Sequence, residues 1–356
     1  MHSLPLEVLL DISPSSRLDL IDIHKKITDE VNGESLLYKK ATYCSFHTTA
    51  GYLEQSICSR LDYQKDHIKS FIKAFQKLFP VNGDYHHDQM DLRKELDETQ
   101  RQCEPKNGDS HLTFISSGLR NCVTYQNKPD IPVYFIDLDG VHEHGQRNRH
   151  TSVMYYNQEE IVHKHVVDVP VSKHPIDAIN LRDKKLGYID KLNSLLAKYK
   201  VQKGRVEISL DSAEKNAGLT VNEYETLLME NDLMDVLKNP LQFMSEKTKH
   251  ILQNPKHIPS RTIDYARYDF VRIFNELMDA LHVSQSVLEK ILARFLALPA
   301  ERFLRVKRNI NFLVSNNNNG SNAELVQGTY QSPILVQWKE AKRQTRYLNI
   351  TITRFK

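Results

Sequence analysis

The sequence predicts an α+β fold, and three segments carry that prediction. Apolar and polar residues alternate along Leu4–Ile12, which is the pattern of a strand with one buried face. Leu61–Leu78 instead places its apolar residues at helical spacing and stops at Pro80, as an amphipathic helix does. Tyr347–Arg354 alternates again, so strands are expected near both ends of the chain.

Strands and helices are predicted to alternate through the first part of the chain. Asp22–Val31 is expected to be helical, because its apolar residues recur at helical spacing. The charged stretch 88–107 has no apolar periodicity after Leu96 and is expected to form a long surface excursion. The other strands predicted here are Leu18–Ile23, Leu36–Phe46, Asn121–Tyr125, Val133–Leu138 and His150–Tyr156.

The second part is predicted to be mostly helical and to end in β-strands. Leu186–Lys200 is expected to be a helix. Thr220 and Glu223 have the spacing of a capping box ahead of an apolar run, which predicts a helix start there. The remaining predicted elements are helices at Tyr265–Leu281 and Val283–Leu298 and strands at Ile310–Val314 and Ile334–Trp338.

Length and composition fit a protein of two domains. The chain has 356 residues, of which 40% are apolar and 26% charged. The net charge of +3 is too close to neutral to indicate nucleic-acid binding by itself. We expect domains at 1–158 and 175–356, joined through the β-rich segment Val162–Val171. The sequence shows no internal repeat.

The cysteines and the distribution of apolar residues indicate a cytoplasmic protein. The four cysteines include no CxxC pair, and four in a chain of this length are no disulfide framework. No apolar run approaches the roughly 18 residues that a membrane helix needs. The N-terminus lacks a basic stretch followed by an apolar one, so no signal peptide is expected.

Three motif blocks stand out in the first part of the chain. The first is Cys44–Ala50, which reads CSFHTTA. The second is Phe79–Asp88, FPVNGDYHHD, and the third is Asn107–Leu112, NGDSHL. In this order and spacing the blocks resemble the YjbQ family, sometimes called secondary thiamine-phosphate synthase. The resemblance covers about residues 1–158, and the second half matches no family that we recognise.

The resemblance implies a fold, an assembly and a site. Family members are small α+β domains with a β-sandwich-like core and flanking helices, and they assemble as trimers, so a homotrimer is expected. Their histidines converge in a pocket whose expected occupant is a metal ion. Carried over residue by residue, the metal ligands are His47, His87 and His111, and the catalytic neighbours are Asp66, Glu54 and Tyr85.

Two further family features bear on substrate binding. The family's strand with Trp-Gln-Gly has neither Trp nor Gln here, where Ile131–Asp137 stands, so recognition or activity is expected to differ. The family's basic ending survives as Arg147 and Arg149, whose planar guanidinium groups fit phosphate oxygens. A solvated strand face is the alternative for both arginines. The hydroxyls of Thr48 and Thr49 are expected to help bind the substrate anion.

The residue types fit metal chemistry. Three neutral imidazoles and an open position make up a catalytic zinc site. A metal held in this way polarises a phosphoryl oxygen or lowers the pKa of bound water to about 7. Asp66 or Glu54 then acts as general base or fixes a ligand histidine. The alternative is that each histidine is a structural hydrogen-bonding residue, because 16 histidines produce chance matches to a motif.

The leading hypothesis is therefore a metal-dependent transferase or hydrolase for a small phosphorylated or otherwise anionic substrate. Thiamine-phosphate synthesis is the activity that the resemblance implies. The alternative is a catalytically silent trimeric scaffold whose second half binds a partner or nucleic acid. That alternative rests on the basic segment Glu301–Lys356, where ten Lys and Arg face three Glu and aromatic residues are interleaved.

Overall fold

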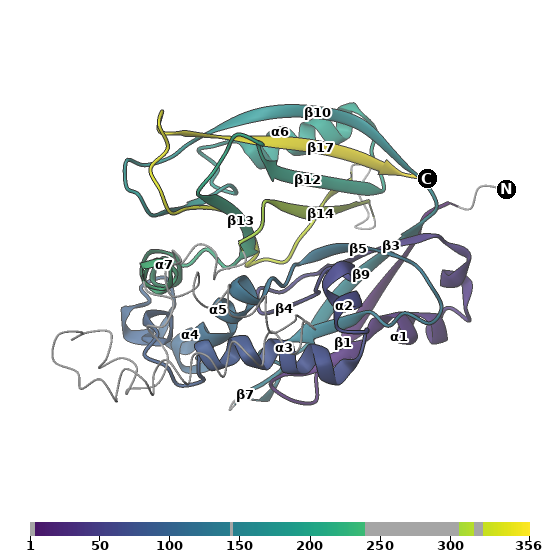
Figure 1. Ribbon diagram of the computed structural model, residues 1–356, viewed down its shortest axis with the longest axis horizontal. Helices are drawn as coiled ribbons and strands as arrows, with labels where there is room; N and C mark the ends of the chain where they lie inside the picture. The colour runs from purple at the N-terminus through teal and green to yellow at the C-terminus, as the bar shows by residue number, and fades with distance from the viewer. Residues whose placement is uncertain (1–3, 143–144, 239–305, 317–322) are drawn as a thin grey trace, which may run out of the picture. The chain divides into compact units, whose positions relative to one another are not determined.

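Most of the chain is placed well enough to describe. The residues that the computed structural model describes are 4–142, 145–238, 306–316 and 323–356 (Figure 1). The helices predicted at Tyr265–Leu281 and Val283–Leu298 lie outside the described residues. The described residues form helices and several antiparallel sheets, which confirms the α+β class and the β-rich C-terminal end.

The chain divides into two compact units, each of which draws on distant stretches of sequence. The sheet unit comprises Met1–Gln55, Gly118–Tyr224 and Val306–Lys356, and the helical unit comprises Ser56–Ser117 and Glu225–Arg305. Each unit therefore takes residues from both of the domains expected at 1–158 and 175–356. That these two domains fold independently stays a prediction.

Two antiparallel sheets make up the first part of the sheet unit. The larger sheet has the order β1-β9-β3-β5 and the smaller has the order β2-β6-β4. Helix α1 follows β2 directly, and the Asp22 side chain caps it by accepting a hydrogen bond from the Lys25 backbone N–H at 3.1 Å. The bounds are β1 Leu6–Ile12, β2 Asp19–Asp22, α1 Ile23–Glu30, η1 Glu34–Leu37, β3 Lys40–Ser45, β4 Ala50–Gly51, β5 Cys122–Gln126, β6 Tyr134–Asp137, β7 Val141–His142, β8 Gly145–Gln146 and β9 Arg149–Tyr156.

Two more antiparallel sheets make up the second part of the sheet unit. The larger has the order β10-β17-β12-β14-β15 and the smaller has the order β11-β16-β13. Helix α6 confirms the helix predicted at Leu186–Lys200. The bounds are β10 Glu159–Pro170, β11 Asp177–Asn180, α6 Tyr188–Lys198, β12 Gly204–Leu210, β13 Ala217–Asn222, β14 Asn309–Ser315, β15 Glu324–Val326, β16 Ser332–Gln337 and β17 Thr345–Phe355.

The strand orders of the two parts are the same. The order β1-β9-β3-β5 has its counterpart in β10-β17-β12-β14, and β2-β6-β4 has its counterpart in β11-β16-β13. We call β1–β6 and β9 with α1 the first repeat, and β10–β17 with α6 the second repeat. The expectation of a chain without an internal repeat is therefore wrong. Alternating apolar residues look alike in every strand and do not reveal which strands pair.

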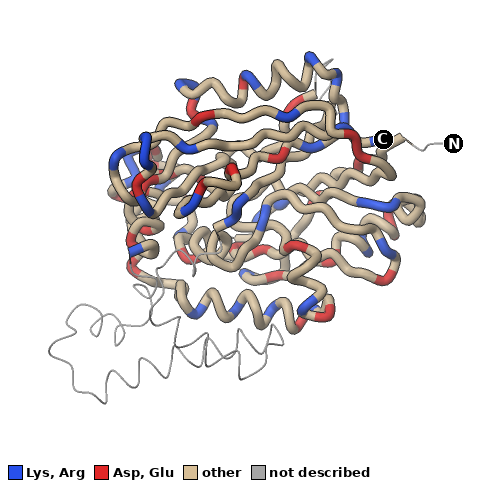
Figure 2. Tube along the Cα trace, turned by 45° about the horizontal axis from the view of Figure 1, so that its top comes forward, with Lys and Arg blue, Asp and Glu red and all other residues tan. Residues whose placement is uncertain are grey.

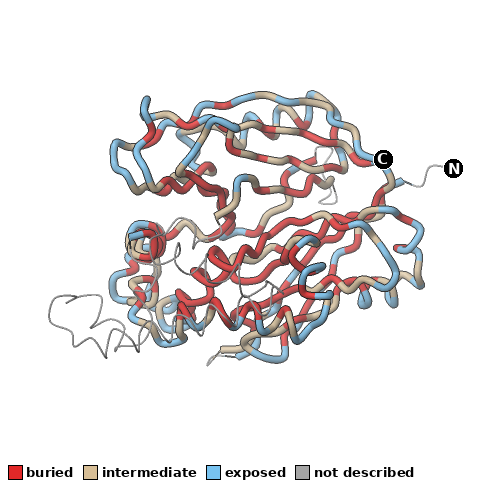
Figure 3. The backbone as a smooth tube through the Cα atoms, viewed as in Figure 1, coloured by how far each residue is buried: buried red, intermediate tan, exposed pale blue. Residues whose placement is uncertain are grey.

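Buried apolar residues run along the strands of both repeats (Figure 3). A further buried cluster joins the repeats: Cys44, Cys122, Met154 and Tyr156 of the first pack against Leu313 and Phe355 of the second. The rings of Tyr156 and Phe355 stack with their centroids 3.7 Å apart. The two repeats therefore share a buried apolar contact, which the hydrophobic effect and ring stacking stabilise.

The described part of the helical unit is built from short helices around the longer α3, which confirms the amphipathic helix expected there. Its buried face carries apolar residues such as Ile68, Phe71 and Phe75. The bounds are α2 Gln55–Arg60, α3 Lys65–Leu78, η2 His86–Asp88, η3 Met90–Leu92, α4 Glu98–Cys103, α5 Gly108–Ser117, η4 Leu227–Asp232 and α7 Leu233–Lys238.

The mostly exposed stretch 88–107 fits the expected surface excursion, two short helices escape apolar periodicity, and one predicted helix start is wrong. The excursion at 88–107 contains α4, which starts at a capping box made by Asp97 and Gln100 and buries no residue, so apolar periodicity could not reveal it. Every residue of α5 is buried, so it has no polar face to set a period. Thr220 lies in β13 instead of capping a helix.

Among the described residues, no helix is long and apolar enough to cross a membrane.

Candidate functional site

Two of the three expected metal ligands meet in the helical unit. The His87 and His111 rings pack edge to face with their centroids 4.9 Å apart, and both side chains are buried. His87 Nδ1 lies 3.1 Å from Glu225 Oε2, and His87 Nε2 lies 3.1 Å from Asn107 Oδ1. A buried imidazole is thus held between a carboxylate and an amide, with a second imidazole beside it.

Glu225 is itself fixed by the start of a helix. Its carboxylate accepts hydrogen bonds from the backbone N–H groups of Leu227 and Leu228 at 2.7 and 2.8 Å. Burial raises the pKa of Glu225, but the bond from His87 and these two backbone bonds outweigh burial and leave the pKa below its ordinary value. Glu225 is therefore ionised at neutral pH, and His87 Nδ1 donates to it.

A second carboxylate holds the backbone of η2, the turn that carries His87. Asp232 accepts hydrogen bonds from the backbone N–H groups of His86 and His87 at 2.8 and 2.9 Å, and His86 Nδ1 lies 3.1 Å from it. Burial raises the pKa of Asp232 although all three bonds favour its charged form. Neither Glu225 nor Asp232 was among the expected site residues, because each is more than 100 residues from the motif that it holds.

The three expected catalytic neighbours differ in burial and in the unit to which they belong. The buried Tyr85 donates its hydroxyl to the Pro80 carbonyl at 2.9 Å, and its ring packs so closely on Gly108 that a Cβ there would lie 2.9 Å from Tyr85 Cβ. Asp66 is exposed in the first turn of α3. Glu54 belongs to the sheet unit, where it forms an ion pair with Arg120 at 2.6 Å.

His47, the third expected metal ligand, lies in the sheet unit. Its Nε2 accepts a hydrogen bond from the His150 backbone N–H at 2.7 Å, and the two rings stack with centroids 6.0 Å apart. Burial, together with the charges of Arg149, His150 and Arg147, lowers the pKa of His47 to about 3. His47 is therefore a neutral imidazole at physiological pH, with its Nε2 lone pair in use.

The arginines expected to bind the substrate anion are paired with carboxylates. Arg149 donates to both carboxylate oxygens of Asp137 at 2.7 and 2.8 Å and to Thr49 Oγ1 at 3.2 Å. Arg147 donates to Asp139 at 2.6 Å. Burial raises the pKa of Asp137 even though Arg149 favours its charged form. Thr48 contributes its carbonyl, which accepts a hydrogen bond from Asn222 at 3.2 Å.

The triad of His47, His87 and His111 stays a prediction, because one member belongs to the sheet unit and two belong to the helical unit. Within the described ranges no three or more His, Cys, Asp or Glu side chains are grouped so that they could hold a metal ion.

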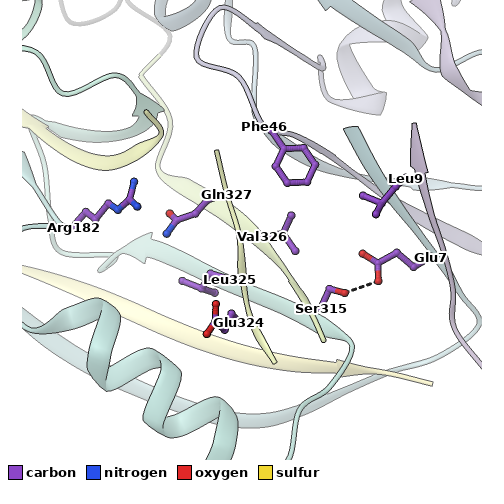
Figure 4. A pocket seen from close by; sticks show the side chains of 9 residues that line it. All are labelled: Glu7, Leu9, Phe46, Arg182, Ser315, Glu324, Leu325, Val326 and Gln327. Carbon is purple, nitrogen blue, oxygen red and sulfur yellow. Dashed lines mark hydrogen bonds between the residues drawn. The ribbon is translucent and has the colours of Figure 1, made fainter. Parts of the chain in front are cut away.

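A pocket of about 290 Å³ lies within the sheet unit (Figure 4). Phe46, from the first motif, forms part of its wall. Glu7 lines it as well and accepts hydrogen bonds from the hydroxyls of Ser152 and Ser315. The other residues that line it are Leu9, Arg182, Glu324, Leu325, Val326 and Gln327.

Arg346, Arg354 and Lys356 of the basic C-terminal segment form ion pairs. Arg346 forms an ion pair with Glu214 at 2.8 Å, and Glu160 pairs with both Arg354 and Lys356. Figure 2 shows acidic and basic residues interspersed along the trace. A nucleic-acid surface on this segment stays a prediction.

Comparisons with known proteins find solved structures of low sequence identity to this chain. No protein-family model matches the chain, and no curated protein matches it. Similar solved structures include a YbjQ-like protein of unknown function from Sulfolobus solfataricus, with 15% identity over 55% of this chain and 99% of that chain, and a TM-score of 0.29. A hypothetical protein from Aeropyrum pernix K1 shares 14% identity over 54% of this chain and 98% of that chain, with a TM-score of 0.28.

A third similar structure is an uncharacterised conserved protein of the yjbq/upf0047 family from Clostridium acetobutylicum, with 12% identity over 53% of this chain and 98% of that chain, and a TM-score of 0.27. The Sulfolobus and Clostridium descriptions name the family that the three motif blocks resemble, and the Aeropyrum description names no family. None of the three states an activity.

Proposed function

We propose that this chain is an enzyme that acts on a small anionic substrate by proton transfer centred on His87, with His111 beside it. The observation that supports this proposal is the buried pair of His87 and Glu225. Burying an ionised carboxylate against an imidazole is costly unless the arrangement is well bonded, and such perturbed groups cluster at functional sites.

The partners of His87 favour a charged ring. Glu225 can only accept hydrogen bonds at its carboxylate, and Asn107 presents its acceptor Oδ1 to the other ring nitrogen. With both nitrogens donating, His87 is proposed to act as an imidazolium, and a substrate oxygen that replaces Asn107 Oδ1 at Nε2 accepts its proton. The positive ring attracts an anion, and Glu225 holds the ring in place during the transfer.

The residues as they stand do not fit a metal at His87, since both of its ring nitrogens are engaged by other groups. We therefore derive no step through a metal. Measuring metal in the purified protein and in a His47→Ala/His111→Ala variant tests the predicted triad separately. The triad predicts stoichiometric metal in the first and none in the second, and equal content would remove it.

The enzyme proposal is tested with a panel of small phosphorylated substrates, including the precursors of thiamine phosphate. Loss of a general acid lowers kcat by about 10²–10⁴-fold, so His87→Gln and Glu225→Gln are both expected to do so. Glu230→Gln is the matched control, because Glu230 is exposed on the same helix as the anchors of Glu225. A folded His87→Gln variant with an unchanged rate would contradict the proposal.

The silent scaffold is a second proposal, favoured by the pairing of Arg147 and Arg149 with buried carboxylates. It expects the full chain to turn over none of these substrates and to bind a partner or nucleic acid through its second half. Titration with RNA or DNA at low and high salt checks it, since phosphate contacts weaken steeply with salt. Absence of binding at low salt counts against the nucleic-acid version.

A further inference from the structure

The two repeats of the sheet unit correspond in register along their paired strands. In the first small sheet Ala50 pairs with Asp137 and Gly51 with Ile136. In the second small sheet the same dipeptide recurs: Ala217 pairs with Gln337 and Gly218 with Val336. The shared register makes Ala217 the counterpart of Ala50 and Gln337 the counterpart of Asp137.

Isolated backbone contacts repeat at the matching positions. Tyr52, the residue after the first Ala-Gly pair, exchanges two backbone hydrogen bonds with Arg120. Leu219, the residue after the second Ala-Gly pair, exchanges two with Lys307. Contacts outside the regular ladders are not required by the sheet order, so their recurrence supports a duplicated fold.

A buried arginine repeats as well. Arg149 Nε donates to Asp137 at 2.7 Å, and its Nη2 donates to the Asp139 carbonyl at 3.2 Å. Arg346 Nε donates to Gln337 at 3.3 Å, and its Nη2 donates to the Lys339 carbonyl at 2.6 Å. Each guanidinium thus binds the residue opposite the alanine and the carbonyl two residues later.

The histidine is not repeated. His47 stands three residues before Ala50, and the residue three before Ala217 is Glu214. Glu214 accepts a hydrogen bond from Arg346 Nη1 at 2.8 Å. Its carboxylate therefore balances the charge of Arg346, because Gln337, the counterpart of Asp137, is uncharged. The second repeat therefore retains the arginine of this fold and lacks the imidazole.

The second repeat instead reaches into the His47 loop of the first. The fully buried Gln331 donates its side-chain amide to the carbonyls of Ser45 and His47 at 3.0 and 2.8 Å. Its Oε1 accepts a hydrogen bond from the Gly328 N–H at 2.9 Å. Gly328 lies so close to the Phe46 carbonyl that a Cβ on it would be 1.8 Å from that oxygen, so only glycine fits there.

This contact runs in one direction. Gln331 stands six residues before Gln337, and the residue six before Asp137 is Ile131, which has no side-chain donor. The residues just before Ile131, at 128–130, are exposed. At the position that matches Gln331 the first repeat thus has no side-chain donor to the second.

We propose that the second repeat is a built-in partner of the first, and that Gln331 is a positioning residue that sets the conformation of the His47 loop and so keeps His47 Nε2 on the His150 N–H. Gln331 fixes the carbonyls on either side of Phe46, and the loop that it fixes aims His47 Nε2 at the His150 N–H. This inference does not depend on the chemistry proposed for His87, because its readout is the state of His47.

The test is NMR of ¹⁵N-histidine-labelled full-length protein carrying Gln331→Met, which keeps the length of the side chain and removes both donors. The wild type is expected to show His47 as the Nδ1–H tautomer, because its Nε2 accepts the His150 N–H. In the variant the loop is no longer held, so His47 loses that tautomer preference and the His150 amide signal shifts as its hydrogen bond breaks.

Gln337→Met is the matched control. Gln337 is equally buried, and its amide also donates to two carbonyls, those of Ser172 and His174, but these belong to the second repeat. It is expected to lower stability and to leave the His47 signal unchanged. Gln331→Asn keeps the donors on a shorter arm and is expected to give a partial loss of the His47 tautomer signal, so it serves if Gln331→Met does not fold. An unchanged His47 tautomer and His150 amide signal in either folded Gln331 variant would overturn the proposal.

Discussion

The first and second repeats of the sheet unit share the residues that maintain their sheets and differ in the loop that carries His47. Both keep the strand order, the Ala-Gly pair and a buried arginine, Arg149 or Arg346. Only the first keeps an imidazole in the loop before the Ala-Gly pair; the second has Glu214 there. The comparison indicates that Arg149 stabilises the fold, whereas His47 occurs in the first repeat alone.

The contact faces of the repeats differ in the same sense. The first repeat presents Cys44, Cys122 and Met154 to the cluster that joins the repeats. The strand pairings place Ser209 opposite Asn309 in the second repeat, where Cys44 lies opposite Cys122 in the first. At this pair of positions the second repeat is thus polar where the first is apolar.

The largest expected effect is on stability, and it tests whether Arg149 is structural. Arg149→Met leaves the fully buried Asp137 carboxylate without its partner, which costs about 3–5 kcal/mol of unfolding free energy. Arg346→Met is expected to cost less, about 1–3 kcal/mol, because Gln337 is neutral and Glu214, the charged partner of Arg346, is less buried than Asp137. Urea denaturation measures both values.

The double variant Arg149→Met/Asp137→Leu is the control, since removing both charges restores an uncharged core. It is expected to recover most of the loss. If Arg149→Met unfolds at the same urea concentration as the wild type and instead weakens anion binding, the framework role is wrong and the predicted substrate role of Arg149 gains support.

A smaller effect is expected on the pH dependence of stability, to which His47 of the first repeat contributes. The folded pKa of His47 is about 3 and its ordinary value is 6.5. Between these values the unfolded chain binds more protons than the folded chain, so the contribution of His47 to stability falls as pH decreases through this window. His47→Gln is therefore expected to reduce the loss of stability between pH 7 and pH 5, measured as the shift in urea midpoint.

His174→Gln is the control for that measurement, because His174 is an exposed histidine of the second repeat. It is expected to leave the pH dependence as in the wild type. Equal pH dependence in the wild type and in the His47→Gln variant would show that His47 is not held neutral by the fold.

The smallest expected effect concerns the helix of each repeat. Asp22 caps α1 with its side chain, whereas α6 starts after Gly187 without a side-chain cap. Asp22→Ala is expected to cost about 1 kcal/mol of unfolding free energy, and Asp22→Asn only a fraction of that, because asparagine also caps. Thermal denaturation of the two variants checks this, and equal losses would mean that the charge of Asp22 matters more than its cap.

Part of the site could be predicted because it is carried by short motifs. His87, Asn107 and His111 lie within the second and third blocks, and the structure brings them together. The partners of these residues could not be predicted. Glu225 and Asp232 carry no motif of their own, and nothing local indicates which imidazole a carboxylate 138 or 146 residues away will meet.

The sequence by itself determined the elements whose apolar residues follow one period: β1, α1, α3, α6 and β17 lie where that period places them. It also determined the identity of the histidines. Only the tertiary structure decided that the strands form the same sheet order twice, that α5 is a wholly buried helix, and that Gln331 holds the loop of His47. The physical reason is that periodicity reports burial along one segment, whereas strand pairing and buried hydrogen bonds join segments whose separation in the chain leaves no local trace.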